Sequence, residues 1–196
     1  MNIILIKRIV FVLALIPLVR LFVLGFFGNL TANPIEFITR STGTWTITFL
    51  SMTLAMSPLR FITGWPQWVQ FRKMLGLFCF FYAFLHFTIW YWLDHNLNFT
   101  FMINDVIKRP FITMGFIAFV IMSLLALTSN QIAMRFLGVK WKMLHRFIYL
   151  IGILGLIHYY WHKQGKNDFA VVYIYAAIIF SLLIIRIPFV KKLIKS

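Results

Sequence analysis

The 196-residue chain is poor in acidic residues and in cysteine. It contains four Asp and Glu residues, one cysteine, and only 12% charged residues. Cys79 lies alone in an apolar run, which excludes a disulfide framework and a thiolate metal cluster. Proton relays in membranes are built from carboxylates inside the spans, whereas these four acids fall in connecting segments. A proton-coupled transporter is therefore disfavoured.

The sequence also lacks the motifs of several enzyme classes. No Gly-x-Gly-x-x-Gly follows a strand, no phosphate loop occurs, and no His-Glu-x-x-His is present. The chain therefore has no apparatus of its own for hydride transfer from a nicotinamide cofactor.

The abundant residues are apolar and aromatic, at 62% and 19% of the chain. Such a composition with long apolar runs indicates an integral membrane protein. The formal net charge of +15 does not indicate nucleic-acid binding, because the basic residues are dispersed between apolar runs. They are better explained as topology signals and as anchors for anionic lipid.

A membrane-spanning helix needs about 20 mainly apolar residues, and six segments qualify. We expect one all-α domain over residues 1–196, an integral membrane six-helix bundle. Its first segment could instead be a signal peptide, but it is longer than a signal core, which favours an uncleaved helix. The expected spans are Ile9–Gly28, Thr44–Ile62, Met74–Leu93, Phe111–Ser129, Leu144–Trp161 and Ala170–Phe189.

The distribution of Lys and Arg near the span ends predicts the orientation. Arg20 falls within the first span, and the other basic residues divide thirteen against five, which places both termini in the cytoplasm. The larger group is Lys7, Arg8, Arg60, Arg72, Lys73, Arg135, Lys140, Lys142, Arg146, Arg186, Lys191, Lys192 and Lys195; the smaller group is Arg40, Lys108, Arg109, Lys163 and Lys166.

Three histidines lie inside these apolar segments: His86 in the third, and His145 and His158 in the fifth. A polar ring at membrane depth is costly without a partner, and neutral imidazole suits iron. At 1.5 Å per residue, His86 and His158 lie about 18 and 21 Å from the cytoplasmic side. The sequence therefore predicts a haem held between His86 and His158.

His145 lies about 20 Å below His158 if the fifth span is one helix. Arg72 and Lys73 occupy its level on the third span, so His145 has no evident partner there. It could ligate through local bending, serve a lower site, or cap the membrane boundary. His86 and His158 could alternatively make only helix–helix hydrogen bonds or join an aromatic interfacial belt. Arg20 could pair with a haem propionate or extend toward the interface.

The chain resembles the MsrQ family of haem-binding membrane subunits along nearly its whole length. The motifs that carry the resemblance are Asn33-Pro-Ile-Glu-Phe, Ser57-Pro-Leu-Arg, Arg72-Lys-Met-Leu-Gly-Leu, Tyr82-Ala-Phe-Leu-His, Lys108-Arg-Pro-Phe-Ile-Thr-Met-Gly, Leu125-Ala-Leu-Thr-Ser and Trp141-Lys-Met-Leu-His-Arg-Phe-Ile-Tyr. That family is in turn similar to the haem domains of transmembrane ferric reductases and NADPH oxidases.

The resemblance implies a b-type haem (haem b), an associated FMN, and the inner membrane of a Gram-negative bacterium. His86, His145 and His158 match the family's intramembrane histidines. The implied partner is MsrP, a periplasmic molybdopterin enzyme that reduces methionine sulfoxide in oxidised proteins. The implied electron donors are the quinone pool or a cytoplasmic flavin reductase.

Arg72, Lys73 and Arg146 could hold the FMN phosphate, because arginine forks match phosphate oxygens. The same three residues could instead be positive-inside anchors. Two other functions stay open on the sequence: a stand-alone membrane haem reductase that serves another acceptor, and a haem-free transporter or structural bundle.

Overall fold

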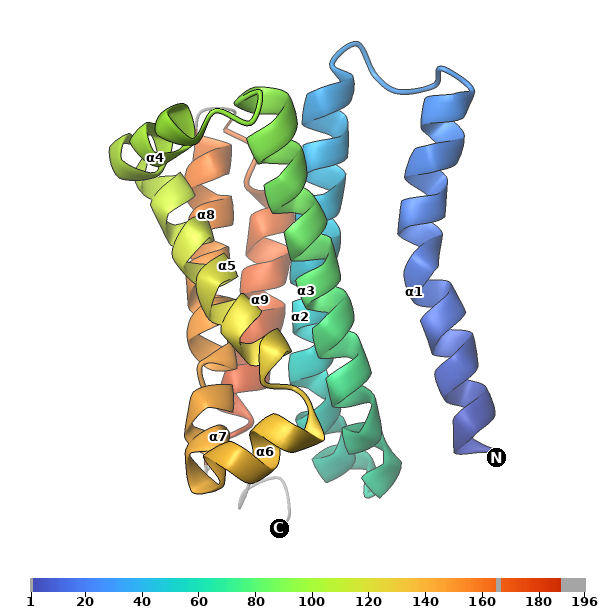
Figure 1. The fold of residues 1–196 in the computed structure, drawn as a ribbon. Coiled ribbons are helices and arrows are strands. Elements are labelled where there is room, and N and C mark those ends of the chain that lie inside the picture. Colours follow the sequence, from blue (N-terminus) through green and yellow to red (C-terminus); the bar gives the residue numbers. More distant parts are fainter. Residues whose placement is uncertain (1, 165–166, 188–196) are drawn as a thin grey trace.

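The computed structural model describes residues 2–164 and 167–187, and every element within these ranges is a helix. Its long helices run alongside one another in alternating directions (Figure 1). They are α1 (Ile3–Phe26), α2 (Pro34–Thr63), α3 (Arg72–Ile89), α5 (Pro110–Leu127), α8 (Ile148–Gln164) and α9 (Ala170–Ile184).

Shorter elements lie at the two ends of the bundle (Figure 1). At one end, the π-helical turn η2 (Trp90–Asp94) extends α3, and α4 (Phe99–Lys108) connects it to α5. At the other end lie the 3₁₀ helix η1 (Pro66–Phe71), α6 (Gln131–Leu137) and α7 (Val139–His145). Pro34, Pro66 and Pro110 each begin a helix, where the absent N–H costs nothing.

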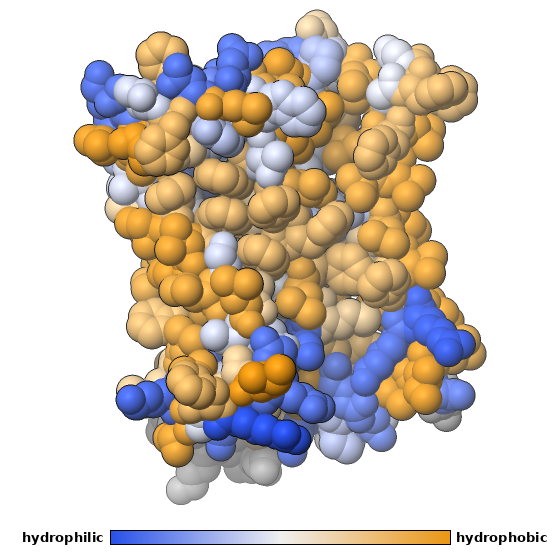
Figure 2. All heavy atoms as spheres, viewed as in Figure 1, coloured by the Kyte–Doolittle hydropathy of each residue, from blue (hydrophilic) through white to orange (hydrophobic). Residues whose placement is uncertain are grey.

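Within the described residues, four stretches are long and apolar enough to cross a membrane: Ile3–Phe26, Pro66–Asp94, Pro110–Leu127 and Val139–Gln164. Figure 2 shows the matching surface, with a hydrophobic middle between hydrophilic ends. The predicted all-α membrane bundle is confirmed. Six spans and cytoplasmic termini stay predictions, and Lys166, Phe189, Lys191, Lys192 and Lys195 lie outside the described residues.

The expected fifth span, Leu144–Trp161, lies within the candidate span Val139–Gln164, but a short turn divides this stretch into α7 and α8. The chain turns at Arg146 and Phe147, so His145 ends α7 and His158 lies in a separate helix. The amides of both turn residues donate to carbonyls three residues earlier, which tightens the backbone and ends α7. The expected separation of His145 and His158 assumed one continuous helix, so it does not apply.

Helix α2 is 30 residues long but rich in hydroxyl side chains. Thr44, Thr46, Thr48, Ser51 and Thr53 each donate a hydrogen bond to the carbonyl four residues earlier. This pairing satisfies the hydroxyls without water, which a buried position requires. The helix can therefore pack beside α3 in the bundle interior despite its modest hydropathy.

Helix α1 is joined to the bundle mainly through α3. The Tyr82 hydroxyl, on a side chain with no exposed surface, donates to the Ala14 carbonyl at 2.8 Å. Phe11 packs edge-on against Phe78, with ring centroids 5.2 Å apart. One buried hydrogen bond and one aromatic contact therefore fix how α1 lies against α3.

Substituting Phe for Tyr82 should destabilise the protein by about 0.6 kcal/mol, the average for an interhelical hydrogen bond in a membrane bundle. Thermal unfolding in detergent measures the loss. Tyr173→Phe is the matched control, because Tyr173 is exposed and its ring packs beside that of Phe169. Equal melting temperatures for the two variants would show that this bond does not hold α1.

Candidate haem site

An internal cavity of about 370 Å³ lies between α2, α3, α5 and α8. Aromatic and small side chains form most of its wall, including Phe87, Phe111, Phe116 and Phe119. Phe87 of α3 and Phe119 of α5 stack on each other in this wall, with ring centroids 4.6 Å apart. His86 and His158 both line this space, so the cavity contains the two histidines that the sequence paired.

The ring of His86 is held by the backbone of α2. Its Nδ1 lies 2.9 Å from the Thr39 carbonyl oxygen, which can only accept a hydrogen bond. Nδ1 must therefore carry the proton, and Nε2 keeps its lone pair. A backbone carbonyl that fixes one ring nitrogen in this way is the usual support of a metal-binding histidine.

His158 is held in the same way by α5. Its Nδ1 lies 2.6 Å from the Phe111 carbonyl oxygen. The accepting residue again precedes its histidine by 47 positions, as Thr39 precedes His86. In both helix pairs, α2–α3 and α5–α8, a backbone carbonyl of the first helix thus accepts a hydrogen bond from a histidine of the second.

The two rings have the spacing of ligands to one metal. Their centroids lie 6.2 Å apart and their planes are nearly perpendicular, at 82°. An imidazole nitrogen binds a metal at about 2 Å, so two imidazoles on opposite sides of one metal have centroids roughly 6 Å apart. Among the described residues no group of three or more His, Cys, Asp and Glu gathers into a metal site. Two nitrogens alone suit haem iron, whose porphyrin supplies its four other ligands.

Glycines in the facing helices make room for both rings. A Cβ built on Gly43 would lie 3.1 Å from His86 Cε1, and one on Gly115 would lie 2.7 Å from His158 Nδ1. Gly43 and Gly115 each lie one helical turn after the residue whose carbonyl accepts the imidazole hydrogen bond, so each ring lies over backbone without a side chain. Gly155 has nothing within 4 Å of its Cβ position, which keeps the cavity open one turn below His158.

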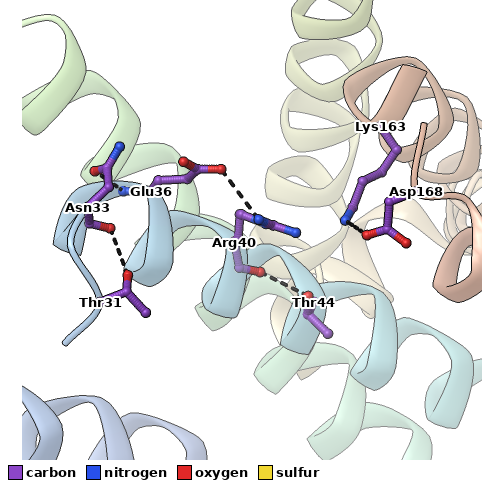
Figure 3. Close-up of polar contacts among 7 residues, drawn as sticks. All are labelled: Thr31, Asn33, Glu36, Arg40, Thr44, Lys163 and Asp168. Atoms are coloured by element: carbon purple, nitrogen blue, oxygen red, sulfur yellow. Dashed lines mark hydrogen bonds and ion pairs between the residues drawn. The ribbon is translucent and has the colours of Figure 1, made fainter. Parts of the chain in front are cut away.

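The mouth of the cavity is charged. Arg40 and Arg109 line it, and each pairs with a carboxylate one turn earlier in the chain, Glu36 at 3.4 Å and Asp105 at 3.0 Å. Figure 3 shows Arg40 lying between Glu36 and the ion pair of Lys163 with Asp168.

The Lys163–Asp168 pair closes the connection from α8 to α9. Lys163 Nζ lies 2.6 Å from Asp168 Oδ2, and this hydrogen bond lowers the pKa of the Asp168 carboxyl. Arg20, which the sequence offered as a partner for a haem propionate, is exposed on α1 and does not line the cavity.

The structure does not bring His145 to the other two histidines. Its ring stacks on Trp141 at 3.9 Å, its Nδ1 lies 3.1 Å from the Trp141 carbonyl, and its Nε2 lies 3.4 Å from Ser129 Oγ. These contacts join α7 to the end of α5. His145 is absent from the described lining of the cavity.

Of the three residues proposed for the FMN phosphate, Arg72 is the one that lines a described cavity. Arg72 lines a second cavity near the opposite end of the bundle, where it donates to Ser57 Oγ at 2.8 Å. Lys73 and Arg146 are exposed and do not contribute to the described lining of that cavity.

Sequence reasoning missed Gly43, Gly115 and the mouth arginines. A signal for the glycines existed, since Gly43 precedes His86 by 43 residues and Gly115 precedes His158 by the same number (86 − 43 = 158 − 115 = 43). Arg40 and Arg109 carried no such signal, because the packing of α2 and α5 in the bundle decides which of their residues face the cavity.

Comparison with known proteins finds one matching family and several similar proteins. The family described as ferric reductase like transmembrane component matches residues 42–156, a range that includes His86 and ends two residues before His158. Curated relatives carry the name protein-methionine-sulfoxide reductase heme-binding subunit MsrQ. The chain is 52% identical over 178 residues to the one from Bordetella parapertussis, which covers 91% of this chain and 86% of that protein.

Two further relatives of the same name cover similar shares. The Ralstonia nicotianae protein is 52% identical over 184 residues, or 93% of this chain and 85% of its own. The Brucella anthropi protein is 39% identical over 172 residues, or 88% and 77%. No solved structure matches the chain.

Substituting Ala for Gly115 should displace the His158 ring and lower haem retention several-fold, because the new methyl group would lie 2.7 Å from Nδ1. Gly43→Ala should have the same effect more weakly, since its contact is 3.1 Å. Gly76→Ala is the control, with only an ordinary 3.7 Å contact. Haem content per chain after purification measures all three, and full retention in Gly115→Ala would contradict the packing explanation.

Proposed function

The chain belongs to the MsrQ family of haem-binding subunits, within the ferric-reductase-like transmembrane proteins, and from this premise we propose that it carries electrons across a membrane through haem b. The observation that carries the proposal is the pair of imidazoles at 6.2 Å, each with Nδ1 against a backbone carbonyl.

His86 and His158 would hold the iron through their Nε2 atoms, from α3 and α8. When bound, the haem supplies a one-electron redox couple; ligand identity, burial and hydrogen bonding tune its potential. Phe87, Phe116 and Phe119 keep the space between the histidines apolar and exclude water. The carbonyls of Thr39 and Phe111 fix the ring tautomers and raise the basicity of the ligating nitrogens.

Arg40 and Arg109 would orient the group in the cavity. Haem carries two propionate carboxylates, and arginine forms charge-assisted hydrogen bonds with carboxylates. Both arginines line the same mouth, so propionates directed toward it would lie near two positively charged side chains. The distribution of Lys and Arg near the span ends predicts that this mouth faces the periplasm. Electrons would therefore leave the haem on the periplasmic side.

The proposed function also includes an electron donor, an electron acceptor and a particular membrane. Electrons would come from quinol or from a reduced flavin, with an FMN at the end of the bundle that carries Arg72, Lys73 and Arg146. They would pass to MsrP, a periplasmic molybdopterin enzyme that repairs oxidised methionine in proteins. The name of the relatives supports a methionine-sulfoxide reductase system, and the net charge of +15 suits the anionic inner membrane of a bacterium.

Replacing either axial histidine should remove the haem. We expect His86→Ala and His158→Ala to lose the paired α and β bands of the dithionite-reduced spectrum, because a single imidazole cannot hold iron from both sides. His145→Ala should keep these bands, since its ring lies outside the cavity lining. One haem per chain is the expected stoichiometry.

Imidazole rescue separates ligation from folding. His158→Gly leaves space for free imidazole, which should restore the bands if the side chain acts as a ligand. Bands that persist at full intensity in both alanine variants would overturn the assignment of His86 and His158.

Electron delivery is tested by adding purified MsrP and methionine sulfoxide to the reduced, detergent-solubilised protein. The haem spectrum should return to its oxidised form faster with substrate than with MsrP alone. Equal rates with and without methionine sulfoxide would argue against this acceptor.

A further inference from the structure

A second cavity, of about 830 Å³, lies at the end of the bundle opposite the mouth of the haem cavity. Its described lining comes from the end of α2, the junction of η1 and α3, the start of α8, and the residues that follow α9. Three arginines from different segments converge on it: Arg60, Arg72 and Arg186. Elements far apart in the sequence thus bring three positive charges to one cavity.

Arg186 is fixed in place by its neighbours. Its Nη1 donates to the Tyr149 hydroxyl at 2.6 Å, its Nη2 donates to the Leu54 carbonyl, and its guanidinium carbon lies 4.9 Å from the Tyr149 ring centroid. Its Nε is buried and has no hydrogen-bond partner among the residues the structure describes. The side chain is therefore pre-positioned, with a donor still unused.

Arg72 is held by one neutral contact, the 2.8 Å hydrogen bond to Ser57 Oγ. A guanidinium has five N–H donors, so most of its capacity is unused by this bond. Arg60 is exposed at the rim of the cavity. The cavity therefore has a positive wall with spare donors.

No side-chain carboxylate of the protein can neutralise this wall. The sequence has four, and they lie at the start of α2, in η2, in α4 and just before α9, which are at the other end of the bundle: Glu36, Asp94, Asp105 and Asp168. Three of them already pair with cations there. Arg60 and Arg72 are exposed and Arg186 is partly buried. Like charges brought together repel one another, so binding of an anion from outside the chain would reduce this repulsion.

We propose that this cavity binds a phosphate group carried by an anionic ligand, with Arg60, Arg72 and Arg186 as its contacts. Planar guanidinium forks match phosphate oxygens, and the Ser57 and Tyr149 hydroxyls can donate to the same group. The carrier is either a phosphomonoester such as FMN or the phosphodiester headgroup of an anionic lipid. In the first form the proposal rests on the flavin part of the proposed function, and in the second it does not.

The first arm compares FMN with riboflavin, which lacks only the phosphate. Flavin fluorescence quenching on titration of the haem-loaded protein should give measurable FMN affinity and much weaker riboflavin affinity. The second pKa of a phosphomonoester is about 6, whereas arginine stays protonated, so FMN affinity should rise between about pH 5 and pH 7. Inorganic phosphate should compete.

The second arm compares nanodiscs of phosphatidylglycerol with nanodiscs of phosphatidylcholine. A bound diester headgroup should raise the melting temperature in the anionic lipid alone. This gain should not vary between pH 5 and pH 7, because a phosphodiester has no ionisation near about pH 6.

The variants are Arg60→Gln, Arg72→Gln and Arg186→Gln, with Arg135→Gln as the matched control. Arg135 is exposed on α6 at the same end and does not line the cavity. A lost charge-assisted hydrogen bond should weaken FMN binding about tenfold, or remove the lipid-dependent gain, while the control stays unchanged. Arg60→Gln keeps the test valid if Arg186→Gln does not fold.

Binding in either arm that weakens in the three variants but not in Arg135→Gln supports the site, and the responding arm identifies the carrier. Equal weakening in the control, or no binding in either arm, overturns it. The haem spectrum of each sample is recorded as well, and because the haem cavity lies at the other end, its loss would point to the proposed haem function instead.

Discussion

Two hydrogen bonds from imidazole Nδ1 to backbone carbonyls organise the centre of this protein. They fix which nitrogen of a neutral imidazole carries the proton, and they aim the remaining nitrogen of each ring away from the helix that holds it. Each also needs a neighbouring helix with no side chain at the point of contact, which Gly43 and Gly115 provide. The 6.2 Å separation of the rings is a consequence of both helix pairs obeying the same constraint.

The remaining polar groups follow from the cost of leaving them unpaired in an apolar medium. Hydroxyls on α2 donate to carbonyls of their own helix, and Tyr82 donates to α1. Charged groups are moved to the ends, but not evenly. The end with the haem-cavity mouth holds all four acidic side chains, three of which pair with cations, whereas at the other end three arginines meet at one cavity. This asymmetry suits propionates at one end and an external anion at the other.

Much of the architecture was predictable because a membrane imposes long apolar helices. The long helices and the proximity of His86 to His158 agree with expectations from composition and helical rise. The connecting segments were not predictable. The helices α4 and α6 and the turn between α7 and α8 are short, and their form depends on packing against the bundle ends.

The sequence alone determined that this is an all-α membrane protein and which two histidines share a depth, because apolar run length and rise per residue are local properties. Only the tertiary structure decided which carbonyls face those rings, that glycines lie opposite them, and that His145 lies elsewhere. It also decided that Arg60, Arg72 and Arg186 meet at one cavity. These outcomes depend on the rotation and pairing of helices that are distant in the sequence, and hydrophobic periodicity carries no information about such pairings.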